Sequence, residues 1–377
     1  MESETNTMTN TETGAAMPKH GIRRGECKTP GGKLVAVTTD GGTCRLDGDF
    51  FTDGDDMAAA ALITDIERTL GAMTAGTASD ATYDMAAVSD GDTAAASADI
   101  IGATMRRHPD ARLIGTDAHA IAIAWRRAIA GGDAPVSICA PTAATTAPGD
   151  EWRVWWRELR PVVVVDEVRG PTEQMEIDER WAREVAAGER PATVRFWRWG
   201  TPAVVVGRFQ SIRDEVHQDA AQAEGFTVVR RCTGGGAMFV RPDDVITYSL
   251  YAPASFVAGA DAAAAYRRCG GWAVDALRRM GVDARFGGLN DIVSQSGKIG
   301  GAAARRFPGP IGAILHHTTL AYRIDVDGMM RILNTSAEKM RDKAVRSARR
   351  RVDPLANLTT LERDEIVRRL VDAARVR

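Results

Sequence analysis

Three short stretches of the sequence carry residue types that could act together on an anionic substrate. Residues 230–239 read RRCTGGGAMF, in which two arginines precede three consecutive glycines. Residues 290–301 read NDIVSQSGKIGG and place Lys298 just before a glycine pair, and residues 315–320 read LHHTTL. Arginine, lysine and exposed backbone N–H groups are the donors that bind phosphates and carboxylates in proteins.

The glycine-rich stretch predicts a binding site for a nucleotide-like ligand. Glycine has no Cβ, so neighbouring backbone N–H groups can approach a phosphate closely. Arg230 and Arg231 alternate across the preceding strand, and we expect only one of them to face the ligand. The pattern matches neither the GxxxxGK[ST] phosphate loop nor GxGxxG. A glycine-rich hairpin with solvated arginines is the alternative interpretation.

The lysine stretch predicts a hairpin that turns at Ser296 and Gly297. Lys298 then begins the returning strand, where its ammonium can stabilise charge that develops on a carboxylate or phosphate. Asn290 and Asp291 supply oxygens suited to Mg²⁺ or to ligand hydroxyl groups. A solvent-exposed lysine beside a turn is the alternative.

The other reactive residues are not spaced as a metal site or a nucleophile with its base would require. His316 and His317 are adjacent in a predicted strand, so they face opposite ways and make a poor metal site. Cys232 lies beside the glycines, but no histidine partner is identifiable for it as a nucleophile. The basic run 346–351 has no interleaved aromatic residues, which favours a solvated helix face over a nucleic-acid site.

The sequence patterns around these stretches predict an α+β fold with a mixed sheet and helices packed against it. β-branched and aromatic runs bounded by turn residues indicate strands, and apolar residues at four-residue steps indicate helices. The predicted strands are 33–39, 44–51, 193–199, 203–209, 226–231, 245–253 and 313–324, and the predicted helices are 58–71, 119–132, 177–188 and 261–281.

Composition divides the chain and excludes several function classes. The chain has 377 residues and a formal net charge of −2, without an apolar run that could span a membrane, so we expect neither nucleic-acid nor membrane binding. The five cysteines form no CxxC pair, which predicts reduced thiols in a cytoplasmic protein. The expected parts are a disordered leader (1–17), a smaller α+β domain (18–132) with a flexible insertion (71–97), a linker (133–150) and a catalytic domain (151–377).

Taken together, the three stretches resemble the lipoate–protein ligase family of the biotin/lipoate ligase superfamily. RFWRWGTPAVVVGRFQ is similar to that family's first strands, and VRSARRRVDPLANL to its closing segment. At the other end, KTPGGKLVAV and CRLDGDFF resemble the small accessory domain that such ligases need for activation. That domain stands first in this chain, whereas it more often follows the catalytic domain or is a separate chain.

The resemblance implies an ATP-dependent, AMP-forming ligase for protein lipoylation. Lipoate or octanoate would attack the α-phosphate of ATP to give an acyl-adenylate, with Mg²⁺ present. A lysine amine on a carrier would then take the acyl group as an amide. The implied carrier is the lipoyl domain of a 2-oxoacid dehydrogenase E2 or a glycine-cleavage H-type carrier protein.

The resemblance also implies roles for individual residues, with Lys298 as the catalytic residue that bridges carboxylate and α-phosphate. Asp291 is implied to hold Mg²⁺. The residues implied to bind ATP or the adenylate are Arg231, Gly234, Gly235, Gly236, Ala237, Met238, Phe239, Asn290, Asp291 and Lys298. Those implied to bind lipoate are Arg230, Gly207, Lys298, Gly301 and His317.

Three alternatives use a related scaffold. An ATP-independent octanoyl- or lipoyl-transferase has a cysteine nucleophile in the loop that corresponds to FGGLND, where this sequence has none. A biotin ligase carries a GRGRxGR-type loop, which is absent here. A non-catalytic acyl- or nucleotide-binding protein has less need of Lys298.

Overall fold

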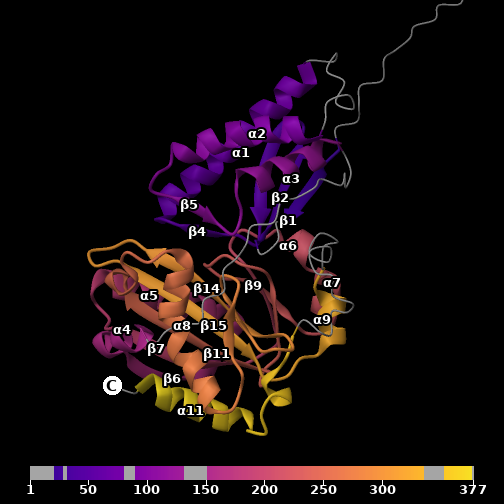
Figure 1. Ribbon diagram of the computed structural model, residues 1–377. Coiled ribbons are helices and arrows are strands. Elements are labelled where there is room, and N and C mark those ends of the chain that lie inside the picture. Colours follow the sequence, from indigo (N-terminus) through magenta and orange to yellow (C-terminus); the bar gives the residue numbers. More distant parts are fainter. Residues whose placement is uncertain (1–20, 29–31, 80–89, 131–150, 335–351, 376–377) are drawn as a thin grey trace, which may run out of the picture.

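The computed structural model describes residues 21–28, 32–79, 90–130, 151–334 and 352–375. We call residues 21–130 the N-terminal unit and residues 151–375 the C-terminal unit. Figure 1 shows the N-terminal unit in indigo and violet, packed against one end of the C-terminal unit. None of the described helices is long and apolar enough to cross a membrane.

A seven-stranded sheet is the centre of the C-terminal unit. Its order is β12-β13-β14-β15-β11-β7-β6, and all neighbours are antiparallel except β6 and β7, which are parallel. The predicted α+β fold with a mixed sheet is confirmed. The strands are β6 (Val162–Arg169), β7 (Thr193–Trp199), β11 (Val245–Pro253), β12 (Arg285–Gly287), β13 (Asp291–Val293), β14 (Lys298–Phe307) and β15 (Ala313–Ala321).

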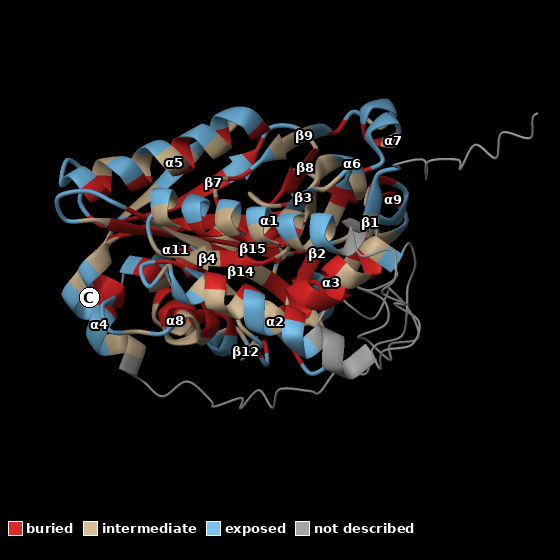
Figure 2. Ribbon diagram, turned by 90° about the horizontal axis from the view of Figure 1, so that it is seen from above, coloured by how far each residue is buried: buried red, intermediate tan, exposed pale blue. Residues whose placement is uncertain are grey.

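Helices cover both faces of this sheet. Side chains alternate along β11, so this strand contacts the helices on both faces. Tyr248 of β11 packs against Trp272 of α8 with ring centroids 4.9 Å apart, whereas Tyr251 packs against Trp181 of α5 at 5.5 Å. In Figure 2 the buried strands lie between α5 and α8. These elements are α4 (Glu151–Leu159), α5 (Pro171–Ala187), α8 (Ala262–Arg279) and α11 (Arg363–Arg375), with 3-10 turns η1 (Ala254–Val257) and η3 (Leu355–Asn357).

A small three-stranded sheet of order β10-β8-β9 lies beside the main sheet and carries the glycine-rich stretch. Residues 231–237, which we call the glycine segment, connect β9 to β10. The strands are β8 (Ala203–Val206), β9 (Thr227–Arg230) and β10 (Met238–Val240), and the helices nearby are α6 (Ile212–Glu215), α7 (Gln218–Ala223) and α9 (Val326–Ile332).

The N-terminal unit has its own sheets, helices and buried core. Of the antiparallel strands β1, β2 and β3, the first two pack against α3 and the third packs against α1, and β4 pairs with β5. The elements are β1 (Arg23–Lys28), β2 (Leu34–Asp40), β3 (Thr43–Gly48), β4 (Phe51–Asp53), α1 (Asp56–Ser79), α2 (Asp90–Arg106), β5 (Arg112–Ile114) and α3 (Ala118–Ala130).

The structure differs from the sequence prediction at residues 71–97. Residues 71–79 continue α1 and residues 90–97 belong to α2, because alanine-rich sequence has high helix propensity. Gly71 does not end the helix; a Cβ there would lie 2.9 Å from the carbonyl oxygen of Gly42. The predicted leader, the linker, the basic run 346–351 and the middle of the predicted insertion (80–89) lie outside the described residues.

A glycine-to-alanine pair tests the packing of α3 on β1. A Cβ at Gly25 would lie 2.1 Å from the carbonyl oxygen of Ala124, whereas a Cβ at Gly76 in α1 would meet nothing within 4 Å. We expect Gly25→Ala to lower the free energy of unfolding by about 3 kcal/mol. Gly76→Ala should raise it by about 0.5–1 kcal/mol. Urea unfolding measures both, and equal stability of the two variants would contradict the packing described.

Candidate active site

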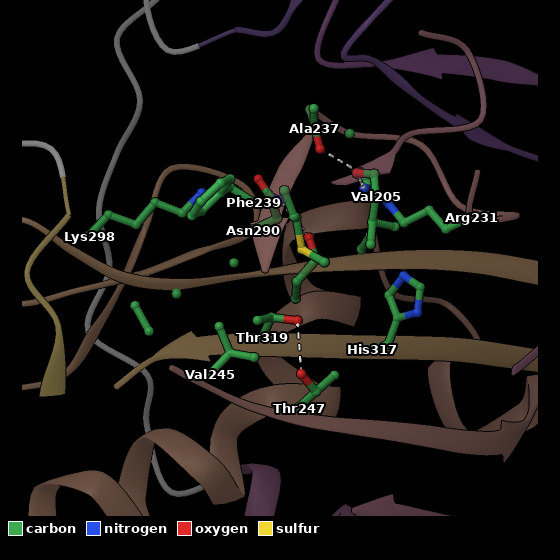
Figure 3. Close-up of a pocket in the computed structure, with 18 of the residues that line it drawn as sticks. Val205, Arg231, Ala237, Phe239, Val245, Thr247, Asn290, Lys298, His317 and Thr319 are labelled. Carbon is green, nitrogen blue, oxygen red and sulfur yellow. Dashed lines mark hydrogen bonds between the residues drawn. The ribbon is translucent and has the colours of Figure 1, made fainter. Parts of the chain in front are cut away.

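A pocket of about 230 Å³ lies between the main sheet and the small sheet and brings the three predicted stretches together. Figure 3 shows Lys298 and Arg231 entering from opposite sides, with Asn290 and Phe239 between them. The predicted site residues that line the pocket are Arg231, Gly235, Gly236, Ala237, Met238, Phe239, Asn290, Lys298, Gly301 and His317. Those that do not are Arg230, Gly207, Gly234 and Asp291.

Much of the pocket wall is apolar. Trp197 and Trp199 of β7, Val245 of β11 and Met175 of α5 line it on the side of the main sheet. Because the cationic side chains enter the same space, the pocket suits an amphipathic molecule with an anionic end and an apolar chain. The tryptophans and Met175 were not predicted as site residues, since aromatic residues in a strand indicate core as readily as a ligand wall.

The position of Lys298 follows from the register of the predicted hairpin, which the structure confirms. Asp291 of β13 pairs with Gly301 of β14, and the Lys298 Nζ lies 2.8 Å from Asp291 Oδ1. A Cβ at Gly301 would lie 3.0 Å from the Lys298 Nζ, so glycine leaves room for the ammonium to lie over its own strand. The spacing from Asn290 to Gly301 therefore holds one lysine against one carboxylate at the edge of the pocket.

Arg231 shapes the glycine segment. Its guanidinium is buried and donates to the carbonyl oxygens of Gly234 at 2.7 Å, Gly236 at 2.9 Å and Val205 at 3.1 Å. Burial lowers the pKa of Arg231 to about 10. A solvated arginine, the alternative interpretation of the sequence, does not describe this residue.

Arg230 lies on the opposite side of the strand, as the alternation predicts. Its Nη1 donates to the carbonyl oxygens of Gly207 at 2.7 Å and of Gln210 at 2.8 Å. A Cβ at Gly207 would lie 1.9 Å from the carbonyl oxygen of Gly235. The structure therefore places Arg230 and Gly207 where two loops meet, outside the pocket wall.

The outer side of the glycine segment contacts the N-terminal unit, which the sequence did not indicate. A Cβ at Gly234 would lie 2.4 Å from the carbonyl oxygen of Phe50, and one at Gly235 would lie 3.1 Å from the Phe51 ring. Gly235 also has a φ of +95°, which favours glycine. Two of the three glycines thus serve the contact between the units.

Charged pairs extend this contact. Asp56 at the start of α1 pairs with Arg305 of β14 and lies 2.6 Å from Arg208, while Asp53 lies 2.9 Å from Arg306. These pairs surround the Phe50–Phe51 corner. The N-terminal unit also places Lys33 in the pocket wall, another residue that had no predicted role.

A buried polar network ties α5 to the glycine segment. Asp178 accepts hydrogen bonds from His317 Nδ1 at 2.7 Å, from Ser249 at 2.8 Å and from the Tyr251 hydroxyl at 2.5 Å. The other ring nitrogen, His317 Nε2, lies 2.7 Å from Thr233 Oγ1. The sequence analysis did not predict a role for Asp178. Its position on the buried side of a predicted helix, where a carboxylate needs partners, could have indicated one.

His316 faces the other way, as strand alternation predicts. Its ring packs against Tyr266 with centroids 5.4 Å apart. Burial lowers the pKa of His316 to about 3, so the ring is neutral near pH 7. Within the described residues, no cluster of three or more histidine, cysteine or carboxylate side chains could hold a metal ion.

Cysteine is missing from the described part of the pocket wall. The cysteines in the described ranges are Cys27, Cys44, Cys232 and Cys269, and none of them lines the pocket. Burial raises the pKa of the Cys232 thiol well above its ordinary value, which disfavours the nucleophilic thiolate. Cys139 lies outside the described residues.

The network around Asp178 predicts a pH-dependent stability. Burial alone would raise the pKa of Asp178, but hydrogen bonds from His317 and Tyr251 hold it below its ordinary value. The contribution of this carboxylate to the free energy of unfolding is therefore complete at pH values above the ordinary pKa of aspartate. It is lost as the pH falls through the lower pKa that Asp178 has in the folded protein. We expect Asp178→Asn to lower the free energy of unfolding by about 3 kcal/mol at pH 7.

Urea unfolding of wild type and variant at pH 7 and in acid measures this difference, which should shrink as the carboxylate of the wild type is protonated. Glu176→Gln, an exposed position of the same helix, is the control and should change stability by less than about 0.5 kcal/mol. A wild-type-like Asp178→Asn at pH 7 would contradict the role assigned to the network.

Comparison with known proteins places this pocket in a family. Residues 170–375 match the family model of the lipoyl protein ligase A/B catalytic domain. Lipoate-protein ligase A subunit 1 of Thermoplasma acidophilum is 31% identical over 204 residues, which cover 52% of this chain and 74% of that protein. Octanoyltransferase LipM of Macrococcus caseolyticus is 27% identical over 216 residues, which cover 51% of this chain and 76% of that protein.

A solved structure of a bipartite lipoate protein ligase and its E2 lipoyl domain from Thermoplasma acidophilum is 29% identical, with a TM-score of 0.49, and the match covers 57% of this chain and 82% of that chain. The family match spans more than half of the chain and includes the glycine segment, the lysine hairpin and the histidine strand. The chain belongs to the lipoyl protein ligase A/B catalytic domain family.

Proposed function

We propose that the protein is an ATP-dependent lipoate–protein ligase. The family contains relatives named as ligase and as octanoyltransferase, so membership alone leaves both reactions open. The observation that favours the ligase is the composition of the pocket wall. Lys298, Arg231 and Lys33 line it, and no cysteine in the described ranges does.

The first step brings two anions together. A carboxylate oxygen of lipoate or octanoate bonds to the α-phosphorus of ATP while the bond from that phosphorus to the β-phosphate oxygen breaks. Pyrophosphate leaves with the electron pair, and an acyl-adenylate remains. Lys298 would lie between the carboxylate and the α-phosphate and lower the cost of their approach.

The geometry of the pocket supports this arrangement. Asp291 holds the Lys298 ammonium at the pocket edge, and Arg231 fixes the glycine segment so that Gly235 and Gly236 present their backbone to the ligand. The apolar wall with Trp197 and Trp199 would take the acyl chain. These contacts support a substrate orientation in which the anionic end and the apolar end occupy different parts of one pocket.

Mg²⁺ would be held mainly by ATP. Asp291 lies 2.8 Å from Lys298, and the amide oxygen of Asn290 accepts from Lys33. Such a donor set, without a cluster of three ligating side chains among the described residues, fits a metal that keeps phosphate and water ligands rather than a cage made by protein. The ion would neutralise charge on the phosphates.

In the second step, a lysine amine of the carrier attacks the carbonyl carbon of the acyl-adenylate. An amide bond forms, the bond from carbon to the adenylate oxygen breaks, AMP leaves, and the amine loses one proton. We propose the lipoyl domain of a 2-oxoacid dehydrogenase E2 or a glycine-cleavage H-type protein as the carrier, on the resemblance described above.

The second candidate function is ATP-independent octanoyl transfer, which the relatives named octanoyltransferase support. It needs a thiolate in the pocket. Cys232 would have to move from its partly buried position and lose the proton that burial favours. Acyl transfer without ATP that vanishes in Cys232→Ala would establish this reaction instead.

Replacement of the catalytic lysine tests the ligase mechanism. We expect Lys298→Ala to reduce lipoate-dependent pyrophosphate release from ATP and Mg²⁺ by about 10²-fold or more, because a fixed cation is lost where negative charge gathers. The side chain is 43% exposed, so the fold should be unaffected. Gln295→Ala, in the same hairpin turn, is the control; a folded and fully active Lys298→Ala would overturn the mechanism.

Two adjacent glycines separate the position of Lys298 from the stability of the sheet. Gly301→Ala should displace the Lys298 ammonium slightly and lower activity by about 10-fold with little change in stability. A Cβ at Gly300 would instead lie 2.5 Å from the carbonyl oxygen of Thr319, so Gly300→Ala should destabilise the protein. Pyrophosphate release and urea unfolding measure the two effects, and an active Gly301→Ala would show that the lysine's position is not critical.

A further inference from the structure

We propose that Lys33, supplied by the N-terminal unit, is a second cation of the activation site and binds an anionic oxygen of the carboxylate or the α-phosphate. The inference rests on the ligase function proposed above. It assigns a chemical role to a residue 257 positions away from its contact in the C-terminal unit.

Backbone and ring contacts direct the Lys33 side chain out of the N-terminal unit. The Lys33 backbone N–H donates to the carbonyl oxygen of Gly115 at 2.6 Å. Gly115 has a φ of +89°, and a Cβ there would lie 2.5 Å from Lys33 Cγ. The ammonium lies 5.5 Å from the centre of the Phe51 ring. The stem is therefore held where β4 and the end of β5 meet the pocket.

The ammonium reaches the C-terminal unit at Asn290. Lys33 Nζ donates to Asn290 Oδ1 at 2.7 Å, and the Asn290 amide group is oriented by donating to the carbonyl oxygen of Ala302 at 2.5 Å. An ammonium has three donors, and within the described ranges Asn290 accepts one of them. Two donors are left to face the pocket that Lys33 lines.

The charges around Lys33 favour an anion between it and Lys298. Burial lowers the pKa of Lys33 to about 8. The charges that act on it are Asp291 and Asp49, which raise this pKa, and Lys298 and Lys28, which lower it. Asp291 already pairs with Lys298 and offsets part of the repulsion between the two ammonium groups, and a substrate oxygen between them would add a second anionic partner for both. A carboxylate or phosphate oxygen is the ligand with that chemistry.

This position also gives the contact between the units a function. Lys33 reaches Asn290 in the arrangement in which the Phe50–Phe51 corner lies on the glycine segment and Asp53 and Asp56 pair with Arg306 and Arg305. The activation site is then complete only while the N-terminal unit is docked. Transfer from a finished acyl-adenylate needs less of this charge, because the carboxylate and the phosphate are already joined.

Steady-state kinetics of the full-length chain test the inference. Lys33→Met keeps an unbranched stem and removes the charge, and Lys33→Arg keeps the charge. We measure kcat and KM for lipoate-dependent pyrophosphate release at neutral pH. Acyl transfer from synthetic lipoyl-adenylate to a recombinant E2 lipoyl domain is measured in parallel. Arg45→Met, at an exposed cation on β3 of the same unit, is the matched control.

Lys33→Met should lower kcat/KM for activation by about 10–10²-fold, with the melting temperature and the transfer rate close to wild type. Lys33→Arg, which keeps the positive charge, should restore kcat/KM for activation close to the wild-type value.

Wild-type kinetics in Lys33→Met would overturn the inference and leave the proposed function intact. Equal losses of activation, transfer and melting temperature would also overturn it, because they would indicate a structural role. Absence of lipoate-dependent pyrophosphate release in the wild type would overturn the proposed function and the inference together.

Discussion

Close approach of backbone to backbone at the glycine segment is the constraint on which the site depends. A Cβ at Gly207 or Gly234 would lie 1.9 Å or 2.4 Å from a carbonyl oxygen of the facing chain. Between these contacts, Arg231 donates to carbonyl groups of the segment itself. One segment therefore forms a wall of the pocket and the surface on which the N-terminal unit packs. A Cβ at Gly207 would push the loop after β8 away from this segment, and a Cβ at Gly234 would push the segment away from the N-terminal unit.

The distribution of charge follows from this geometry. Arg231 donates its hydrogen bonds to backbone carbonyl groups, so it acts chiefly on the shape of the pocket. The two ammonium groups come from different units, Lys298 from the C-terminal unit and Lys33 from the N-terminal unit. Asp291 and Asn290 hold these two ammonium groups near the same space. An anionic reaction centre beside an apolar wall is the substrate that such a pocket stabilises, in keeping with the family to which the chain belongs.

Local sequence rules predicted the strands β7, β8, β9, β11 and β15, the lysine hairpin and the helices α5 and α8, but they did not predict β6, α4 or α11. Strand alternation separated Arg230 from Arg231 and His316 from His317, and the hairpin turn at Ser296 placed Lys298 correctly. The same rules failed at residues 71–79 and 90–97, where small residues without visible period form helix. Weak amphipathic patterns leave helix and irregular chain hard to distinguish until packing against neighbouring elements decides between them.

The sequence by itself indicated the α+β class, the hairpin and the candidates Arg231, Lys298 and the consecutive glycines, because these depend on neighbours within about a dozen positions. Only the tertiary structure decided that Lys33 reaches Asn290, that Asp178 orients His317, and that Gly234 faces the N-terminal unit rather than the pocket. The physical reason is that each of these contacts joins residues far apart along the chain. Their distance is set by how the two units and the layers of the sheet pack, which no local pattern encodes.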